Sequence, residues 1–130
     1  MCIFCKIINN EIPCIKIYES DTSLAFLDVN PTTKGHCLVI PKKHYDNFIE
    51  VNDHDRIKYL EDLHHVTKMI NNKLKPNGIN ILSNINEIAG QTVFHTHFHI
   101  IPRYDENDGI NINFEQKEYD LQEIQKLIVK

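Results

Sequence analysis

Hydrophobic and polar positions along the chain predict a series of short strands and three helices. A short helical turn is expected over residues 3–9. Short apolar runs bounded by turn residues are typical of β-strands. We expect such strands at residues 15–18, 23–28, 35–41, 79–82 and 93–101, the last closed by Pro102.

The strongest helical pattern follows Asn52, a residue that can cap a helix, and ends before Pro76, Asn77 and Gly78, which can stop one. Apolar residues recur there at intervals of three and four, so they form one stripe on a helix. The stripe consists of Ile57, Leu60, Leu63, Val66, Ile70 and Leu74. A last helix over residues 119–129 would carry Leu121, Ile124, Leu127 and Ile128 on one side.

This order of elements indicates the fold class. Three strands precede the long helix and two follow it, and the strand pairs are joined by short connections. Such connections favour a mainly antiparallel sheet, so we expect an α+β fold with a five-stranded sheet, one long helix and a C-terminal helix. A chain of 130 residues without repeats or linkers predicts a single domain, residues 1–130.

Composition excludes several classes of protein. A formal net charge of −4 argues against a general nucleic-acid binder. No apolar run of about 18 residues is present, so we expect no membrane span. The opening residues do not resemble a signal peptide, which predicts a cytoplasmic protein. In that compartment the four cysteines are expected to be thiols or metal ligands rather than disulfides.

Three histidines alternate in the predicted strand over residues 93–101. His95, His97 and His99 would share one face, opposite Phe94, Thr96, Phe98 and Ile100. The line of imidazoles has three interpretations: a polar surface, a metal site, or chemistry on a phosphate. Because His95 and His99 would lie roughly 13 Å apart, at most two of them could share one metal. A neutral imidazole is a nucleophile and a protonated one is a donor to phosphate, which favours the third interpretation.

The residues just before the histidines support phosphate chemistry. Residues 89–92 (AGQT) offer exposed backbone N–H groups, an amide and a hydroxyl at a glycine-containing turn. Turns of this kind can hold phosphate oxygens.

Several blocks together resemble the histidine triad (HIT) family, whose signature is His-φ-His-φ-His-φ-φ with φ apolar. Residues 95–101 (HTHFHII) match it, apart from Thr96 at a usually apolar position. Residues 24–29 (LAFLDV), 35–44 (GHCLVIPKKH) and 89–94 (AGQTVF) look like further family blocks. The resemblance covers about residues 2–104 and fades over residues 105–130, a variable C-terminal segment.

The resemblance implies a mechanism and a set of site residues. His97 would attack the α-phosphorus of a nucleotide and form a nucleotidyl-histidine, which water would release. His99 would contact the phosphate, and His36 would be the family's fourth histidine. Asp28 would bind the ribose hydroxyls. The remaining nucleotide contacts would be Phe4, Ile7, Phe26 and Val29 at the base, Asn84 at the pocket edge, and Gly90, Gln91 and Thr92 at the phosphate and leaving group.

One residue of the phosphate-side loop departs from the family pattern. Asn86 stands where many relatives carry Gly. Since Asn tolerates a positive φ better than most residues, we expect the turn to survive.

Within the family, the chain looks like the nucleoside phosphoramidase branch, acting on purine nucleotides with adenosine favoured. Diadenosine polyphosphate hydrolase activity is the alternative of the same family. A nucleotide-binding sensor or scaffold with weak turnover is another, and a zinc-dependent hydrolase a third. The resemblance also implies a homodimer, with the long helix and a sheet edge in the contact. No organic cofactor is expected.

Cys2 and Cys5 form a C-x-x-C pair at the start of the chain. Such a pair suggests a redox motif or half a zinc site, or simply two buried thiols. A redox motif would follow a strand, and this pair does not. Some family members with this pair complete a structural Cys2His2 zinc site, and the matching ligands here would be His44 and His95.

Overall fold

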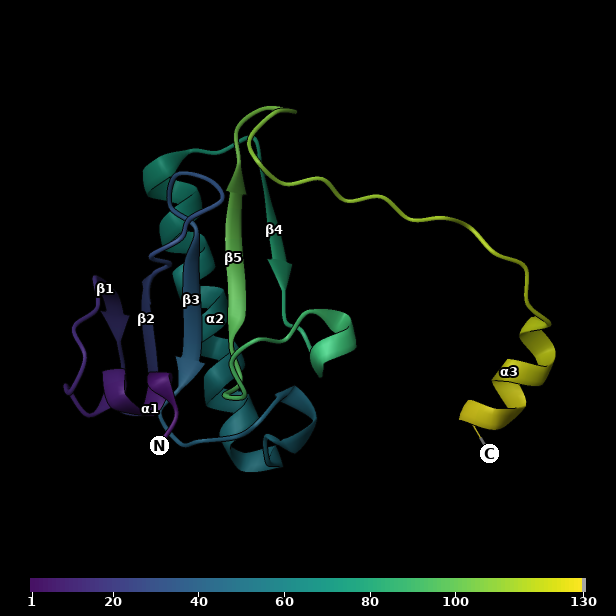
Figure 1. The fold of residues 1–130 in the computed structure, drawn as a ribbon, viewed down its shortest axis with the longest axis horizontal. Helices are drawn as coiled ribbons and strands as arrows, with labels where there is room; N and C mark the ends of the chain where they lie inside the picture. The colour runs from purple at the N-terminus through teal and green to yellow at the C-terminus, as the bar shows by residue number, and fades with distance from the viewer. Residues whose placement is uncertain (130) are drawn as a thin grey trace.

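The computed structural model describes residues 1–129, and its elements follow the predicted order (Figure 1). Lys130, the last residue of the predicted domain, lies outside the described residues. The helices are α1 (Ile3–Ile8), α2 (Asp53–Leu74) and α3 (Leu121–Ile128), with 3-10 turns η1 (Phe48–Glu50) and η2 (Glu87–Ala89). The strands are β1 (Lys16–Glu19), β2 (Ser23–Leu27), β3 (Cys37–Pro41), β4 (Gly78–Leu82) and β5 (Phe98–Arg103).

The five strands form one antiparallel sheet in the order β1-β2-β3-β5-β4. The α+β class and the antiparallel sheet are therefore confirmed. β3 lies at the centre, and all five of its residues are buried. Within residues 1–129, β1 and β4 each pair on one side only and form the two edges.

Two apolar layers cover the two faces of the sheet, because successive strand residues point to opposite sides. Ala25, Cys37 and Val39 belong to the layer under α2. Their neighbours Phe26 and Leu38 belong to the second layer. The second layer is completed by Phe4 and Ile7 of α1, together with Leu24 and Ile40. The short helix α1 is thus part of the core, which fixes its position on the sheet.

The long helix α2 has the predicted ends. The side chain of Asn52 accepts a hydrogen bond from the backbone N–H of Asp55 at 2.7 Å, and Lys75 ends the helix in the left-handed conformation. The predicted apolar stripe is wrong at its beginning. Ile57 and Leu60 are 60% and 37% exposed. Tyr59 takes their place in the core, because the buried face runs through residues 59, 63, 66 and 70.

A buried carboxylate fastens α2 to the β1–β2 hairpin. Asp62 accepts hydrogen bonds from the hydroxyl of Ser20 at 2.7 Å and of Tyr18 at 3.3 Å, and Lys58 lies 3.2 Å away. Burial opposes ionisation, but the nearby hydroxyls of Ser23 and Ser20 and the Lys58 ammonium hold the pKa of Asp62 below its ordinary value. A buried carboxylate is tolerated in a protein interior when several groups donate hydrogen bonds to it. This network therefore helps to position the helix, in addition to the apolar packing.

The last strand is shorter at its beginning than predicted. β5 starts at Phe98 and continues through Pro102 to Arg103, so only His99 of the three alternating histidines lies on a strand. The pairing of β3 with β5 stops at Val39 and Phe98, because His95 Nε2 donates to the Pro41 carbonyl at 2.8 Å instead. The backbone before Phe98 is irregular, so the predicted alternation of faces is wrong there. Phe94, which was predicted to face the core, is exposed, whereas the side chain of Thr96 is buried.

The last helix lies apart from the sheet. Residues 111–120 are all exposed, and the chain runs from the end of β5 past β4 to α3 (Figure 1). The apolar residues Leu121, Leu127 and Ile128 of α3 are exposed. No helix among the described residues is long and apolar enough to cross a membrane.

The corrected face of α2 predicts which side chains stabilise the fold. Ile70→Ala should lower the free energy of unfolding by about 2–5 kcal/mol, because it leaves a cavity between α2 and the sheet. Ile15→Ala, at an exposed isoleucine, should change it by less than about 0.5 kcal/mol. Urea unfolding of both variants measures the difference. Equal losses would contradict the assignment of the core.

Candidate active site and metal centre

A cavity of about 480 Å³ lies where α1, β2 and the histidine segment meet. Its apolar wall includes Phe4, Ile7, Phe26, Val29 and Leu38. Its polar lining includes Asp28, Thr92, His97 and His99. The cavity therefore joins an apolar slot to a carboxylate and two imidazoles.

His97 presents one ring nitrogen without a proton. Its Nδ1 lies 2.7 Å from the backbone carbonyl of His95, which only accepts, so Nδ1 carries the proton and donates it. The lone pair is therefore on Nε2. The ring packs edge-on against Phe4, with 5.2 Å between centroids, and is 6% exposed. Burial lowers the pKa of His97, so the neutral imidazole is favoured at neutral pH.

His36 and His99 form a hydrogen-bonded pair whose protons can also be assigned. The backbone N–H of Thr32 donates to His36 Nδ1 at 3.1 Å, so the proton of His36 is on Nε2. That proton points to His99 Nδ1, 2.9 Å away. The proton of neutral His99 is then on its own Nε2, so His99 can donate from Nε2 whereas His97 offers a lone pair there. Burial, with His97 and His36 nearby, lowers the pKa of His99 to about 4.

Asp28 stands at the end of β2, beside this pair. One of its oxygens accepts the backbone N–H of Asn30 at 2.9 Å, which fixes the carboxylate. The other oxygen lies 3.5 Å from His36 Nε2. The side chain is partly exposed and faces the cavity, so it can accept hydrogen bonds from a ligand.

The loop before the histidines is held by Gln91. Its buried amide donates to the carbonyls of Asp46 at 2.5 Å and Val93 at 3.1 Å, and its oxygen accepts the N–H of Asn86 at 2.8 Å. Asn86 has a φ of 72°, which bears out the expectation that asparagine supports this turn. Because these bonds occupy the amide, Gln91 positions the loop in this structure, and its contact with phosphate stays a prediction.

Two more predicted nucleotide contacts lie in the same loop. Gly90 has a φ of 106°, and its carbonyl accepts the side-chain N–H of Asn84 at 3.3 Å. Neither Gly90, Asn84 nor Gln91 is among the residues that line the cavity, so their roles as ligand contacts also stay predictions.

Some lining residues were missed by the sequence analysis. Leu38 pairs with Phe26 across β2 and β3, so the register of two predicted strands would have placed it on the same face. Ile12, Pro13 and Val93 also line the cavity. They lie in irregular backbone, for which the hydrophobic pattern holds no signal.

Cys2, Cys5, His44 and His95 converge beside α1, with all four ligand atoms within 4.8 Å of one another. The Sγ atoms of Cys2 and Cys5 lie 3.3 Å and 3.4 Å from Nδ1 of His95 and of His44, respectively. The two Nδ1 atoms are 3.1 Å apart. Spacings of this size suit four ligands around one tetrahedral ion.

The proton positions explain why this cluster fits a cation. His95 donates its Nε2 proton to the Pro41 carbonyl, and His44 Nε2 lies 2.9 Å from the carboxylate of Asp46. When both rings are neutral, their lone pairs are thus on Nδ1 and face each other, and neither nitrogen can donate to the other. A metal ion between them satisfies both, and the outer partners are those that metal-bound histidines usually have.

A second group, Asp28, His36 and His99, has similar spacing but different protons. His36 would have to move its Nε2 proton to Nδ1 before it could bind a metal. Nδ1 would then face the Thr32 N–H, donor against donor. The group is therefore satisfied as a hydrogen-bonded chain.

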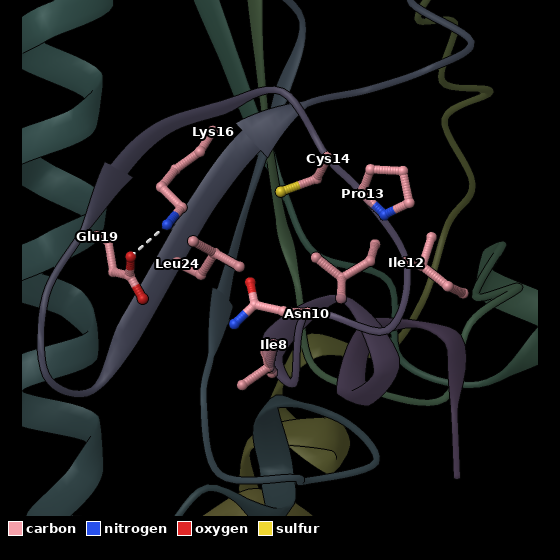
Figure 2. A pocket seen from close by; sticks show the side chains of 9 residues that line it. Ile8, Asn10, Ile12, Pro13, Cys14, Lys16, Glu19 and Leu24 are labelled. Atoms are coloured by element: carbon pink, nitrogen blue, oxygen red, sulfur yellow. Dashed lines mark hydrogen bonds and ion pairs between the residues drawn. The ribbon is translucent and has the colours of Figure 1, made fainter.

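A neighbouring cavity of about 430 Å³ is lined by residues of α1, of the loop that follows it, and of β1 and β2 (Figure 2). Lys16 and Glu19 at its rim pair with each other at 2.5 Å, so their charges compensate. Burial raises the pKa of the Cys14 thiol, which makes it less reactive. This cavity has none of the histidines of the first.

Comparison with known proteins identifies the family. The profile of the HIT domain matches residues 9–106. An uncharacterized HIT-like protein of Methanocaldococcus jannaschii is 50% identical over 129 residues, which cover 98% of each chain. The adenosine 5′-monophosphoramidase of Schizosaccharomyces pombe is 44% identical over 126 residues, covering 97% of this chain and 92% of that protein.

A solved structure agrees with the sequence relatives. The crystal structure of a HIT family member from Bacillus subtilis superposes with a TM-score of 0.92 at 45% identity, covering 98% of this chain and 94% of that chain. The chain therefore belongs to the histidine triad (HIT) family.

Proposed function

We propose that the protein is a hydrolase that acts on the α-phosphate of purine nucleoside phosphoramidates. The observation that carries the proposal is the unprotonated Nε2 of His97 in a cavity that also holds an apolar slot and a fixed carboxylate. The base fits between Phe4, Phe26 and Val29, and Asp28 accepts the two ribose hydroxyls. This placement leaves the α-phosphate beside His97 and His99.

The proton arrangement gives each histidine one task. His97 Nε2 attacks phosphorus, and the bond between phosphorus and the amine nitrogen breaks toward nitrogen, which takes up a proton from solvent water. His99 donates from Nε2 to a phosphate oxygen, and His36 keeps His99 in that tautomer. Water then attacks phosphorus and gives up a proton to solvent, the bond to His97 breaks with its electrons returning to Nε2, and the nucleoside monophosphate leaves. The neutral state of both rings follows from their burial.

The relatives support the phosphoramidate over other substrates of the family. The Schizosaccharomyces pombe protein, with 44% identity over nearly the whole chain, is an adenosine 5′-monophosphoramidase. Adenosine is therefore the favoured base. Diadenosine polyphosphates would use the same three histidines and differ only in the leaving group.

We also propose a structural zinc ion at Cys2, Cys5, His44 and His95. Its role would be structural: it would hold α1 on the sheet, since Cys2 caps that helix and Cys5 lies within it. α1 supplies Phe4 and Ile7 to the cavity, so the ion would stabilise the apolar slot without touching the phosphate.

A homodimer through the β4 edge is proposed as well. β4 is an open edge, and the α2 side of the sheet carries the exposed Ile81 there. The exposed Leu60 lies on the flank of α2 opposite to Asp62, which faces β1 through Ser20. An open edge beside exposed apolar side chains is typical of an interface between copies.

His97→Ala should abolish turnover and preserve binding. We expect AMP release from adenosine 5′-phosphoramidate to fall on the order of 10³-fold or more, because the nucleophile is lost. Binding of AMP, measured by calorimetry, should persist, since the slot and Asp28 remain. His54→Ala, at an exposed histidine of α2, is the matched control and should keep full activity.

The same assay separates the branches of the family. If AMP is released faster from diadenosine tetraphosphate than from adenosine 5′-phosphoramidate, the dinucleotide would take the place of the phosphoramidate as the proposed substrate. No AMP from either substrate would contradict a hydrolase for these compounds and leave a nucleotide-binding protein. Unchanged activity of His97→Ala would contradict the mechanism itself.

The acid side of the pH profile should be displaced toward low pH. His97 must be neutral to attack, and burial lowers its pKa below the ordinary 6.5. As the pH falls through this lowered pKa, His97 gains a proton and kcat/KM falls. We therefore expect the acid midpoint of kcat/KM below 6.5, with circular dichroism confirming that the protein stays folded. A midpoint at or above 6.5 would contradict a buried, neutral nucleophile.

Purified protein should contain about one zinc ion per chain by elemental analysis. Cys5→Ser should lose the ion and raise KM for the nucleotide, because α1 is released. Cys14→Ser is the matched control, since Cys14 lies outside the cluster, and it should retain the metal. Metal-free protein with unchanged stability and KM would refute a structural ion.

A further inference from the structure

The helix α3 presents an apolar side that no other element among residues 1–129 covers. Leu121, Leu127 and Ile128 are each at least 75% exposed, and Figure 1 places α3 away from the sheet. Asp120 caps the helix, so its start is well defined. An isolated helix of 8 residues is only marginally stable in water, so this one needs a surface to pack on.

An apolar groove of suitable character lies at the C-terminal end of α2. The cavity of about 350 Å³ is bounded by Ile17 of β1, Leu27 of β2, and Met69, Ile70 and Leu74 of α2. The proposed nucleotide site lies elsewhere: of these residues only Leu27 lines both cavities. Exposed apolar concavities of this kind mark interaction surfaces.

The charges of helix and groove are complementary. Lys34 and Lys73 line the groove, and neither forms an ion pair with another residue among 1–129. Residues 115–128, which lead into and form α3, carry four acidic residues against Lys117 and Lys126, and Lys126 pairs with Glu123 at 3.3 Å. Acidic groups beside the apolar side of α3 would meet the two lysines when the helix fills the groove.

The course of the chain indicates that the groove belongs to a second copy. The segment before α3 leaves β5 near the chain's own groove, where the Tyr104 hydroxyl donates to the Lys34 carbonyl at 2.7 Å. It then turns away, passes the open edge β4, and places α3 beyond that edge (Figure 1). The helix thus lies on the side where a copy paired through β4 would stand.

The symmetry of such a pair brings the partner's groove to α3. Antiparallel pairing of two β4 edges puts a two-fold axis perpendicular to the sheet. This rotation exchanges the two ends of the sheet and carries the groove from the β1 side to the far side of β4. In Figure 1 the groove end of α2 is at the top of the sheet, and α3 lies beyond β4 toward the bottom.

We propose that the two copies exchange their C-terminal arms, each α3 packing into the groove at Met69 and Leu74 of the other copy. This inference rests on the proposed homodimer, to which it adds a second contact. The arm would tie the copies together at a distance from the β4 edge.

A cysteine pair tests the exchange in the full-length protein. Ile124 is at the centre of α3 and Met69 lines the groove, so Ile124→Cys combined with Met69→Cys should form a disulfide under mild oxidation. Exchange of arms predicts a covalent dimer on a non-reducing gel, with the link assigned by mass spectrometry of peptides. Ile124→Cys with Lys68→Cys, one residue along α2 and exposed, is the matched control and should form no such link.

Light scattering on the reduced protein tests the homodimer separately from the exchange of arms. A dimer without the Ile124–Met69 link would overturn the exchange and leave the homodimer. A monomer would overturn both. A link within one chain would show that α3 folds back onto its own groove, which also overturns the exchange.

Discussion

The hydrogen bond from His95 Nε2 to the Pro41 carbonyl determines the arrangement of the whole site. It ends the pairing of β3 with β5, since the carbonyl is occupied by a side chain. It fixes the proton of His95, so that Nδ1 faces the two cysteines. The bent segment also turns the His95 carbonyl toward His97 Nδ1, which leaves the lone pair of His97 on Nε2. One buried bond thus connects the Cys2, Cys5, His44 and His95 cluster to the ring of His97.

The sequence predicted the elements and their order because these follow from local patterns. Caps such as Asn52 and the short apolar runs are visible in the chain itself. The face of α2 was assigned wrongly at Ile57 and Leu60, because apolarity alone does not show which side meets the sheet. Tyr59 is buried since its hydroxyl donates to the Val39 carbonyl at 2.7 Å, a partner that only the fold supplies.

The candidate site shows the same limit in chemical terms. Alternation suggested one line of three histidines, whereas each ring has a different acceptor or donor and a different direction. His95 turns to the cysteines, His97 to Phe4 and the cavity, and His99 to His36. The family resemblance predicted different roles for the three rings. Spacing could not, because the direction of each ring depends on backbone carbonyls and on the Thr32 N–H.

Two clusters with nearly equal spacing differ in what they can bind, and protons decide the difference. At His44 and His95 the Nε2 groups point outward to Asp46 and Pro41, so the two Nδ1 atoms face each other and the cluster can hold a cation. At His36 and His99 one proton points inward, so the pair is complete without a metal. Counting ligand atoms within reach would treat the two alike. The groups around each imidazole therefore leave the first cluster able to accept a cation and the second complete as a hydrogen-bonded pair.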